Sequence, residues 1–128
     1  MIAVVNCLRR KPGVSLEDFV AWWEGPHAEL VSSNAKATGL QEVLWLPRKD
    51  GPLARGFHAE LEGKRPPAFD GLVINQFNTA GEMLELAKTD EGRKAAEASR
   101  ADAADWVDAV NSVRTMTYIE SVFRADAG

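Results

Sequence analysis

Apolar residues gather in four runs whose length and composition are typical of β-strands. The runs are Ile2–Leu8, Leu40–Leu46, Leu72–Phe77 and Arg114–Phe123. The first is apolar at almost every position, which indicates a strand that is covered on both faces. The last is rich in threonine, tyrosine, isoleucine and valine, which favour extended backbone. The pattern predicts these four strands, and the short patch Phe57–Leu61 predicts a further small one.

A helical pattern follows the first strand. Apolar side chains recur at helical spacing at Leu16, Phe19, Val20 and Trp23. Ser15 is a suitable N-cap, because its hydroxyl can accept a hydrogen bond from a free amide of the first turn. Gly25-Pro26 then interrupts the pattern, since proline lacks an amide donor and disfavours helical backbone at the residue before it. We therefore expect a kinked pair of helices, roughly 15–24 and 26–33.

Two further helices precede the last strand. Thr79–Lys88 has Thr79 as a cap, and the second helix is the alanine-rich stretch Ala95–Val110, with Gly92 marking a bend between them. The resulting order is β-α-β-β-α-β, which is that of the ferredoxin-like arrangement. We therefore predict an α+β fold, in which helices cover one face of a four-stranded antiparallel sheet and the first and third strands are central. Residues 47–69, rich in proline and glycine, form a long connection that is either functional or partly mobile.

The sheet face opposite the helices has no predicted cover. Its strands do not alternate cleanly between polar and apolar residues, as a face in contact with water requires. The simplest explanation is that a second copy of the chain packs on this helix-free face, sheet against sheet. We therefore predict a homodimer.

Length and charge narrow the class of protein. A chain of 128 residues fits one domain, which we place at residues 1–124, with 125–128 as a frayed tail. The net charge of −4 argues against binding to nucleic acid or to anionic membranes, which reward basic surfaces. The apolar run at the N-terminus is too short for a secretion signal or a membrane span. Cys7 has no second cysteine to pair with, and we expect a cytoplasmic protein.

Sequence motifs for common cofactors are missing. The chain has no glycine-rich phosphate loop, no Walker lysine and no nucleophile elbow. Its two histidines and one cysteine are far apart in the sequence, which makes a poor metal site. These residues therefore give no signal for a phosphate-binding loop, a serine nucleophile or a metal site.

Several segments resemble the EthD-domain family of the dimeric α+β barrel superfamily. They are Leu8-Arg9-Arg10-Lys11-Pro12-Gly13-Val14-Ser15, then Glu17, Phe19, Trp22, Trp23 and His27, then Phe69-Asp70-Gly71, and last Asp102-Ala103-Ala104-Asp105-Trp106-Val107-Asp108. The resemblance implies a homodimer that forms a dimeric α+β barrel, a pocket between sheet and helices, and no obligatory metal or organic cofactor. Members and close relatives include lactone isomerases, polyketide cyclases, dehydratases and cofactor-free oxygenases. Asn75-Gln76 departs from the apolar or aromatic pair that the family pattern has at this place.

His27 is the leading catalytic candidate, and its position matches the family. Continuing the stripe from Phe19 and Trp23 by one turn places His27 on the same inward face. The positive end of a helix that starts near Pro26 disfavours an imidazolium ion. A neutral imidazole can accept a proton and return it near pH 7. The alternative is a core histidine that is hydrogen-bonded to the backbone.

Two asparagines in the central strands are the next candidates. Buried amides need partners, and asparagine is unfavourable in strands. Asn75, as a second catalytic residue, and Asn6 can therefore line a pocket and polarise a carbonyl or hydroxyl of a substrate. The alternative is a buried amide paired with backbone or water. Gln76 points to the other face, toward the dimer partner.

Aromatic side chains complete the expected substrate site. Trp22 and Trp23 are about 100° apart on a helix, so we expect Trp23 in the core and Trp22 at the rim of a pocket or interface. Packing is the simpler role for Trp45 and Trp106. The residues assigned to substrate binding are Asn6, Trp22, Trp23, Trp45, Phe77 and Trp106.

Two acidic residues near the end of the chain are weaker candidates. Asp105 and Asp108 lie three apart on one face of the expected helix, where they can pair with Arg9 or Arg10. A solvated helix face is the simpler interpretation, so we assign neither residue a catalytic role.

Together these residues favour a cofactor-independent acid–base enzyme of the isomerase, dehydratase or cyclase type, acting on a small cyclic or aromatic oxygenated metabolite. His27 would move a proton next to a carbonyl, and Asn75, with Asn6, would stabilise the charge that develops on the oxygen. Two alternatives stay open. One is a cofactor-free monooxygenase of the same superfamily, and the other is a non-catalytic accessory protein that binds a small molecule in a degradation pathway.

Overall fold

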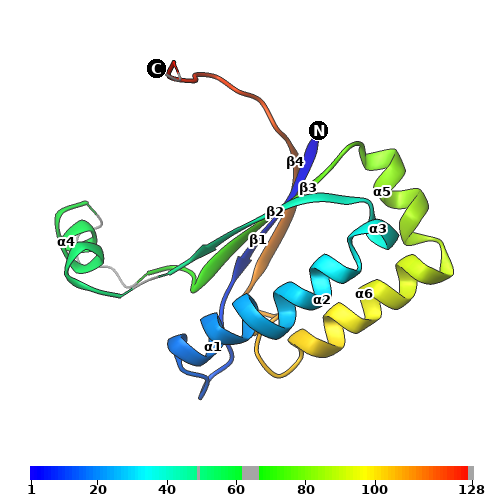
Figure 1. Ribbon diagram of the computed structural model, residues 1–128. Coiled ribbons are helices and arrows are strands. Elements are labelled where there is room, and N and C mark those ends of the chain that lie inside the picture. Colours follow the sequence, from blue (N-terminus) through cyan, green and yellow to red (C-terminus); the bar gives the residue numbers. More distant parts are fainter. Residues whose placement is uncertain (49, 62–66, 127–128) are drawn as a thin grey trace.

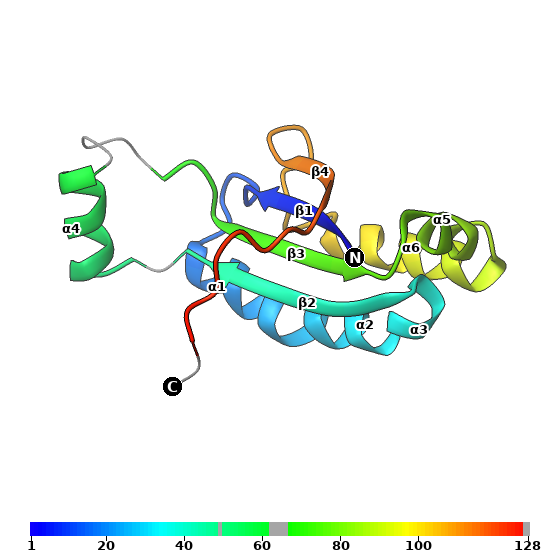
Figure 2. The same cartoon turned by 90° about the horizontal axis from the view of Figure 1, so that it is seen from above.

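The computed structural model describes residues 1–48, 50–61 and 67–126, with the backbone alone at 58–61. At its centre is a four-stranded antiparallel sheet in the order β2-β3-β1-β4 (Figure 1, Figure 2). The strands are β1 (Ile2–Leu8), β2 (Leu40–Pro47), β3 (Gly71–Phe77) and β4 (Val113–Tyr118). The predicted α+β fold is confirmed, with the first and third strands central. β4 ends at Tyr118, so our expectation that it continues to Phe123 was wrong. Of the expected frayed tail, residues 127–128 lie outside the described residues.

Most helices cover one face of the sheet (Figure 1). They are α1 (Leu16–Trp22), the π-helix η1 (Trp23–His27), α2 (Ala28–Ser33), α3 (Ala35–Thr38), α5 (Ala80–Ala87) and α6 (Asp90–Ala103). Ser15 and Thr79 cap α1 and α5 as expected, each accepting a hydrogen bond from an amide of the first turn. In the described part of the chain, none of the helices has the length and apolar character needed to cross a lipid bilayer.

α4 (Pro52–Leu61) stands apart from the sheet, beyond the end of β2 (Figure 2). Our expectation of a short strand at Phe57–Leu61 was therefore wrong. A helix satisfies its backbone hydrogen bonds internally, whereas a strand at this place would have no neighbouring strand to pair with.

The chain does not break at Gly25-Pro26. Instead α1, η1 and α2 follow one another directly, and the amide of Ala28 donates to the carbonyls of Trp23 and Gly25. This wider turn accommodates proline, which has no amide to donate. Our expectation of two helices, roughly 15–24 and 26–33, was wrong in this respect. The π-turn places His27 at its last position.

α6 begins and ends earlier than the expected range 95–110. Thr89 caps it by accepting a hydrogen bond from the amide of Gly92, so Gly92 lies in the first helical turn rather than at a bend. A Cβ added at Gly92 would lie 2.0 Å from the carbonyl oxygen of Leu86. Only glycine allows the two helices to approach so closely here.

The core lies between the helices and the sheet. Its buried cluster consists of Phe19, Trp22, Trp23 and Val73. Trp45 packs against this cluster from β2. A Cβ added at Gly71 would lie 2.3 Å from the indole of Trp45, so the absence of a side chain at Gly71 makes room for that ring.

Strand register decides which side chains face the helices. Val4 pairs with Asn75 and Asn6 pairs with Val73, and directly paired residues share a face of a sheet. Because Val73 belongs to the core on the helical side, Asn6 faces the helices, and so does Asn75 two positions along the strand. Gln76 points to the opposite face, as expected.

The face opposite the helices carries exposed apolar side chains. Leu44, Leu46 and Val113 are 41%, 46% and 53% exposed. The register places them on the same side as Gln76, and none of the described helices covers this side (Figure 2).

Candidate active site

His27 is buried, with 8% of its surface exposed, and it is held by a carboxylate from another helix. Its Nδ1 lies 2.9 Å from Oδ2 of Asp102, near the end of α6. The same oxygen accepts a hydrogen bond from Nε1 of Trp22 over 3.1 Å. Two ring nitrogens on neighbouring turns therefore share one carboxylate, which holds both rings in place.

The carboxylate also fixes the tautomer of His27. An ionised Asp102 can only accept hydrogen bonds, so Nδ1 carries the hydrogen between them, and in the neutral ring Nε2 presents a lone pair. Among the described residues Nε2 has no hydrogen-bond partner, since the bond to Asp102 is made by Nδ1. His27 can therefore take a proton at Nε2 from a molecule that reaches it.

The four tryptophans of the chain assemble around this histidine. The ring centroid of Trp22 lies 4.5 Å from that of His27, and Trp23 presents an edge-on contact at 5.6 Å. Trp106 stacks on Trp22, with 5.6 Å between centroids, and Trp45 stacks on Trp23 at 4.4 Å. Both Trp22 and Trp23 are buried, whereas we expected Trp22 at the rim of a pocket. Two indole rings therefore contact His27, and the other two pack against those indoles.

Trp45 contributes a polar group as well. Its Nε1 is buried and has no hydrogen-bond partner among the described residues. An unpaired buried donor costs about 1–3 kcal/mol, a cost that an accepting oxygen of a bound molecule would remove.

The asparagines lie on the same side of the sheet but are not bonded to His27. Oδ1 of Asn6 accepts a hydrogen bond from Nε of Arg114 over 2.7 Å. The side chain of Asn75 is half-buried and makes no hydrogen bond within the described part of the chain. Phe77, at the end of β3, is also half-buried and pairs in register with Ile2.

Asp102 is the residue of this candidate site that the sequence pattern did not indicate. It lies inside the segment that resembles the EthD family, where the pattern indicated Asp105 and Asp108 instead. The available signal was one acidic residue between alanines, on a helix face of small residues that packs against η1 and α2. An isolated carboxylate on an otherwise small, buried helix surface indicates a specific partner.

Asp105 and Asp108 do not form the expected helical pair, because α6 ends at Ala103. Neither binds Arg9 or Arg10 through its side chain. Asp108 instead accepts from the side-chain and backbone nitrogens of Asn111. The side-chain hydrogen bond from Asn111 is the main cause that lowers the pKa of Asp108.

Over the described ranges, no group of three or more His, Cys, Asp or Glu side chains is placed to hold a metal ion. The side chains gathered at His27 are one carboxylate and aromatic rings, a set that suits proton transfer and the binding of a flat molecule.

A family model described as the EthD domain matches residues 11–109. The chain belongs to the EthD domain family. The matched segment of this EthD domain includes both His27 and Asp102. No curated protein matches the sequence.

Solved structures similar to this EthD domain share its fold. An EthD-family protein from Bacillus halodurans is 14% identical, with a TM-score of 0.58, and the match covers 94% of this chain and 100% of the other. A protein of unknown function from Bacteroides fragilis, described as dimeric and ferredoxin-like, is 8% identical, with a TM-score of 0.56 and coverage of 92% and 95%. SnoaB from Streptomyces nogalater, described as a cofactor-independent oxygenase, is 11% identical, with a TM-score of 0.56 and coverage of 97% of each chain. The TM-scores show a common fold.

Proposed function

We propose that this EthD-domain protein is a cofactor-independent acid–base enzyme acting on a small cyclic or aromatic oxygenated metabolite. The observation that carries the proposal is the His27–Asp102 hydrogen bond inside the cluster of tryptophans. A histidine that is buried, oriented by a carboxylate and open at its second nitrogen is the arrangement that general acid–base catalysis uses.

In the proposed mechanism, Nε2 of His27 takes a proton from the carbon next to a substrate carbonyl. Asp102 keeps the ring oriented and balances the positive charge that the ring acquires. The proton then returns to another carbon, giving isomerisation, or to a departing hydroxyl, giving dehydration. General acid–base catalysis of this kind contributes roughly 10²–10⁴-fold in rate.

Binding and charge stabilisation would come from the surrounding residues. The indoles of Trp22 and Trp23, whose rings contact His27, would be the apolar neighbours of a bound ring. The negative charge that develops on the carbonyl oxygen needs donors placed in advance. We propose that Nε1 of Trp45, which has no partner among the described residues, and the amide of Asn75 supply them.

Hydrogen exchange tests this proposal. The probe is α-tetralone in deuterated water. Proton NMR follows the loss of the signal of the hydrogens on the carbon next to the carbonyl, as deuterium replaces them. The wild-type protein should accelerate exchange over buffer, and His27→Ala should return the rate to that of buffer. If the wild-type protein binds the ketone without accelerating exchange, the acid–base proposal is wrong and the accessory binding role is favoured.

A cofactor-free oxygenase is the second candidate, favoured by the structural likeness to SnoaB. His27 would take the hydroxyl proton of an activated phenol, and the resulting anion would react with dioxygen. With 1-naphthol, one dioxygen is consumed, the ring carbon is oxidised to a carbonyl, and the second oxygen atom leaves as water, giving 1,4-naphthoquinone. An oxygen electrode and the quinone absorbance distinguish this reaction from hydrogen exchange, which consumes no oxygen.

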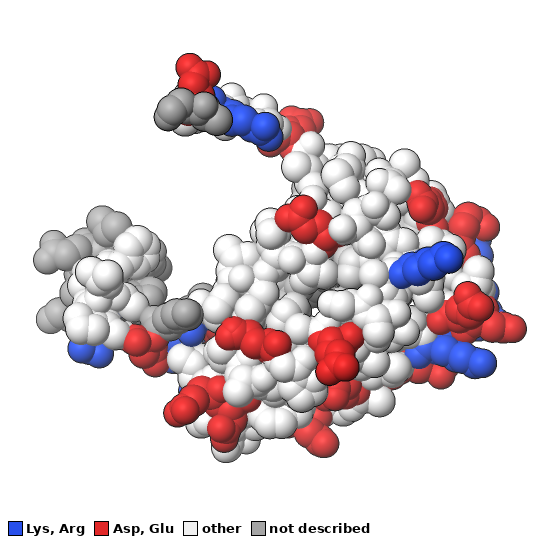
Figure 3. Space-filling view, in the orientation of Figure 1, with Lys and Arg blue, Asp and Glu red and all other residues white. Residues whose placement is uncertain are grey.

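We further propose that the protein works as a homodimer through the helix-free face of the sheet. Similar solved structures are described as dimeric. α4 and the segment after β4 extend away from the body (Figure 1) and expose Leu53 and Phe123 by 91% and 85%. In Figure 3 the acidic side chains gather over the helices, while the surface that faces the gap between these two extensions is mostly uncharged. Exposed apolar side chains that gather on one face are typical of an interface.

A further inference from the structure

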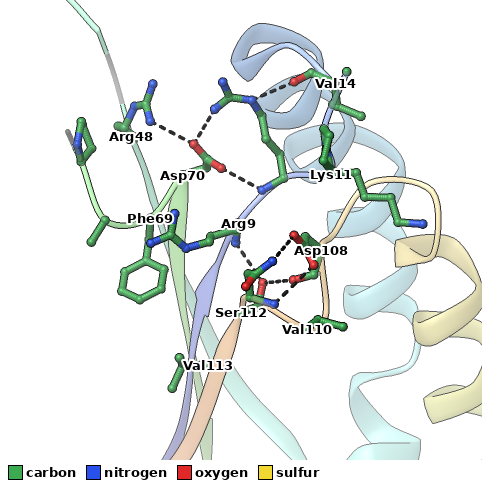
Figure 4. A pocket seen from close by; sticks show the side chains of 16 residues that line it. Arg9, Lys11, Val14, Arg48, Phe69, Asp70, Asp108, Val110, Ser112 and Val113 are labelled. Carbon is green, nitrogen blue, oxygen red and sulfur yellow. Dashed lines mark hydrogen bonds and ion pairs between the residues drawn. The ribbon is translucent and has the colours of Figure 1, made fainter.

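A cleft lies at the end of the sheet where β1 finishes. Its volume is about 760 Å³, and three chain segments form its walls, 9–14, 67–70 and 108–113 (Figure 4). None of the residues that surround His27 lines it. The cleft is therefore separate from the proposed active site.

Most charges in this cleft are already balanced. Asp70, only 7% exposed, binds the guanidinium groups of both Arg10 and Arg48. Arg48 also contacts Asp50. Lys11 extends away from Arg9 (Figure 4) and lies near enough to Asp108 to help lower the pKa of that carboxyl.

Arg9 is the exception. Its guanidinium carbon lies 5.3 Å from the centroid of the Phe69 ring, and the group has no carboxylate partner within the described residues. Stacking on an aromatic face holds the guanidinium plane while its N–H groups stay available for a ligand. A planar fork of this kind matches a carboxylate by two parallel hydrogen bonds.

The backbone amides around Arg9 indicate which class of anion the cleft can bind. Phosphate sites usually use several free amides, but here the amides of Arg9, Arg10 and Lys11 already donate within the protein, over 2.9, 2.8 and 2.9 Å. The lining also includes the exposed apolar side chain of Val110. We propose that this cleft binds a small monocarboxylate with an apolar body, its carboxylate on Arg9 and its body against Phe69 and Val110.

NMR titration with benzoate tests the inference, with ring signals of Phe69 as the reporter. Benzoate should bind and shift these signals, and Arg9→Gln should weaken its binding by roughly tenfold or more, since a hydrogen bond to a charged group is lost. The matched control is Arg100→Gln, an exposed arginine on α6, which should bind benzoate like the wild type.

Further measurements on the wild-type protein test the proposal without any variant. Benzyl alcohol, which has the same ring without the charge, should bind more weakly than benzoate. Added salt should lower the affinity of the protein for benzoate. Equal binding of benzyl alcohol, or the absence of any benzoate shift at Phe69, would overturn the proposal. Displacement of benzoate by an equal concentration of inorganic phosphate would show a general anion site and would refute the carboxylate class.

Discussion

At the scale of single residues, the site depends on a carboxylate with two partners. Oδ2 of Asp102 accepts from His27 and from Trp22, so the ring that would move protons and a ring that would bind substrate are held by one atom. Removing the charge of Asp102 should therefore disturb catalysis more than folding, because an amide can keep the size and part of the hydrogen bonding.

Asp102→Asn should lower the rate of hydrogen exchange in α-tetralone by roughly tenfold or more, because the charged hydrogen-bond partner of the histidine is lost. The Michaelis constant and the thermal midpoint should change little. The control is Glu97→Gln, an exposed acid on the same helix. An equal loss of rate in both variants, or unfolding of Asp102→Asn with loss of His27 burial, would assign Asp102 a structural role alone.

Asp108 offers a test of local electrostatics. The side chain of Asn111 holds the pKa of Asp108 below its ordinary value of 3.8. A lowered pKa means that the carboxylate stabilises the fold at neutral pH and that this contribution is lost as the pH falls through the lowered value. Asn111→Ala should raise the pKa of Asp108 toward its ordinary value in a carbon-detected NMR titration. No change in that titration would contradict the assigned cause.

At the scale of elements, local pattern predicted the strands and most caps, but not the geometry that builds the site. Ile2–Leu8 was predicted with its observed bounds because apolar runs and turn residues are local signals. The π-turn at Gly25-Pro26 was not, since the same residues also suit a break between helices. Thr89 followed by two acidic residues is a local signal for a helix that begins at Asp90. The glycine at position 92 indicated a bend there instead, so the start of α6 was not predicted.

The contact between His27 and Asp102 lies beyond the reach of such patterns. The two residues are 75 positions apart, and their meeting depends on how α6 packs across η1. The gathering of four tryptophans has the same cause. Trp22 was expected at a rim because a straight helix places neighbours about 100° apart, but the packing of Trp106 from the turn after α6 covers it.

The close approach of Gly71 to Trp45 allows a test of the packing between β3 and β2. Gly71→Ala should destabilise the fold by about 1–3 kcal/mol, the usual cost of overpacking, because the new Cβ would lie 2.3 Å from the indole. Urea unfolding measures the free energy. The control is Gly81→Ala on α5, where nothing lies within 4 Å of the added Cβ, and which should be neutral or stabilising by up to ~1 kcal/mol. Equal stabilities of the two variants would show that Trp45 can move aside.

At the scale of the whole molecule, the sheet is a layer with one side covered. The helices bury one face, and Leu44, Leu46 and Val113 remain exposed on the other. A water-facing antiparallel sheet normally carries polar residues at such positions, so a second copy of the chain explains the pattern. The copy would also give the apolar side chains of α4 and of the segment after β4 a surface to contact.

Charge placed on this face should separate the copies. Light scattering at micromolar concentration should give the wild-type protein twice the mass of the chain, and Leu44→Glu should give a folded monomer, because pairing would then bury an unpaired carboxylate at high cost. Leu84→Glu is the matched control, since Leu84 is 56% exposed on α5, on the helical side of the sheet, and it should stay dimeric. A monomeric wild-type protein would refute the interface, and so would a Leu44→Glu protein that keeps the dimer mass. If Leu84→Glu alone separates the copies, the dimer forms through the helices, and the apolar sheet face then requires another partner.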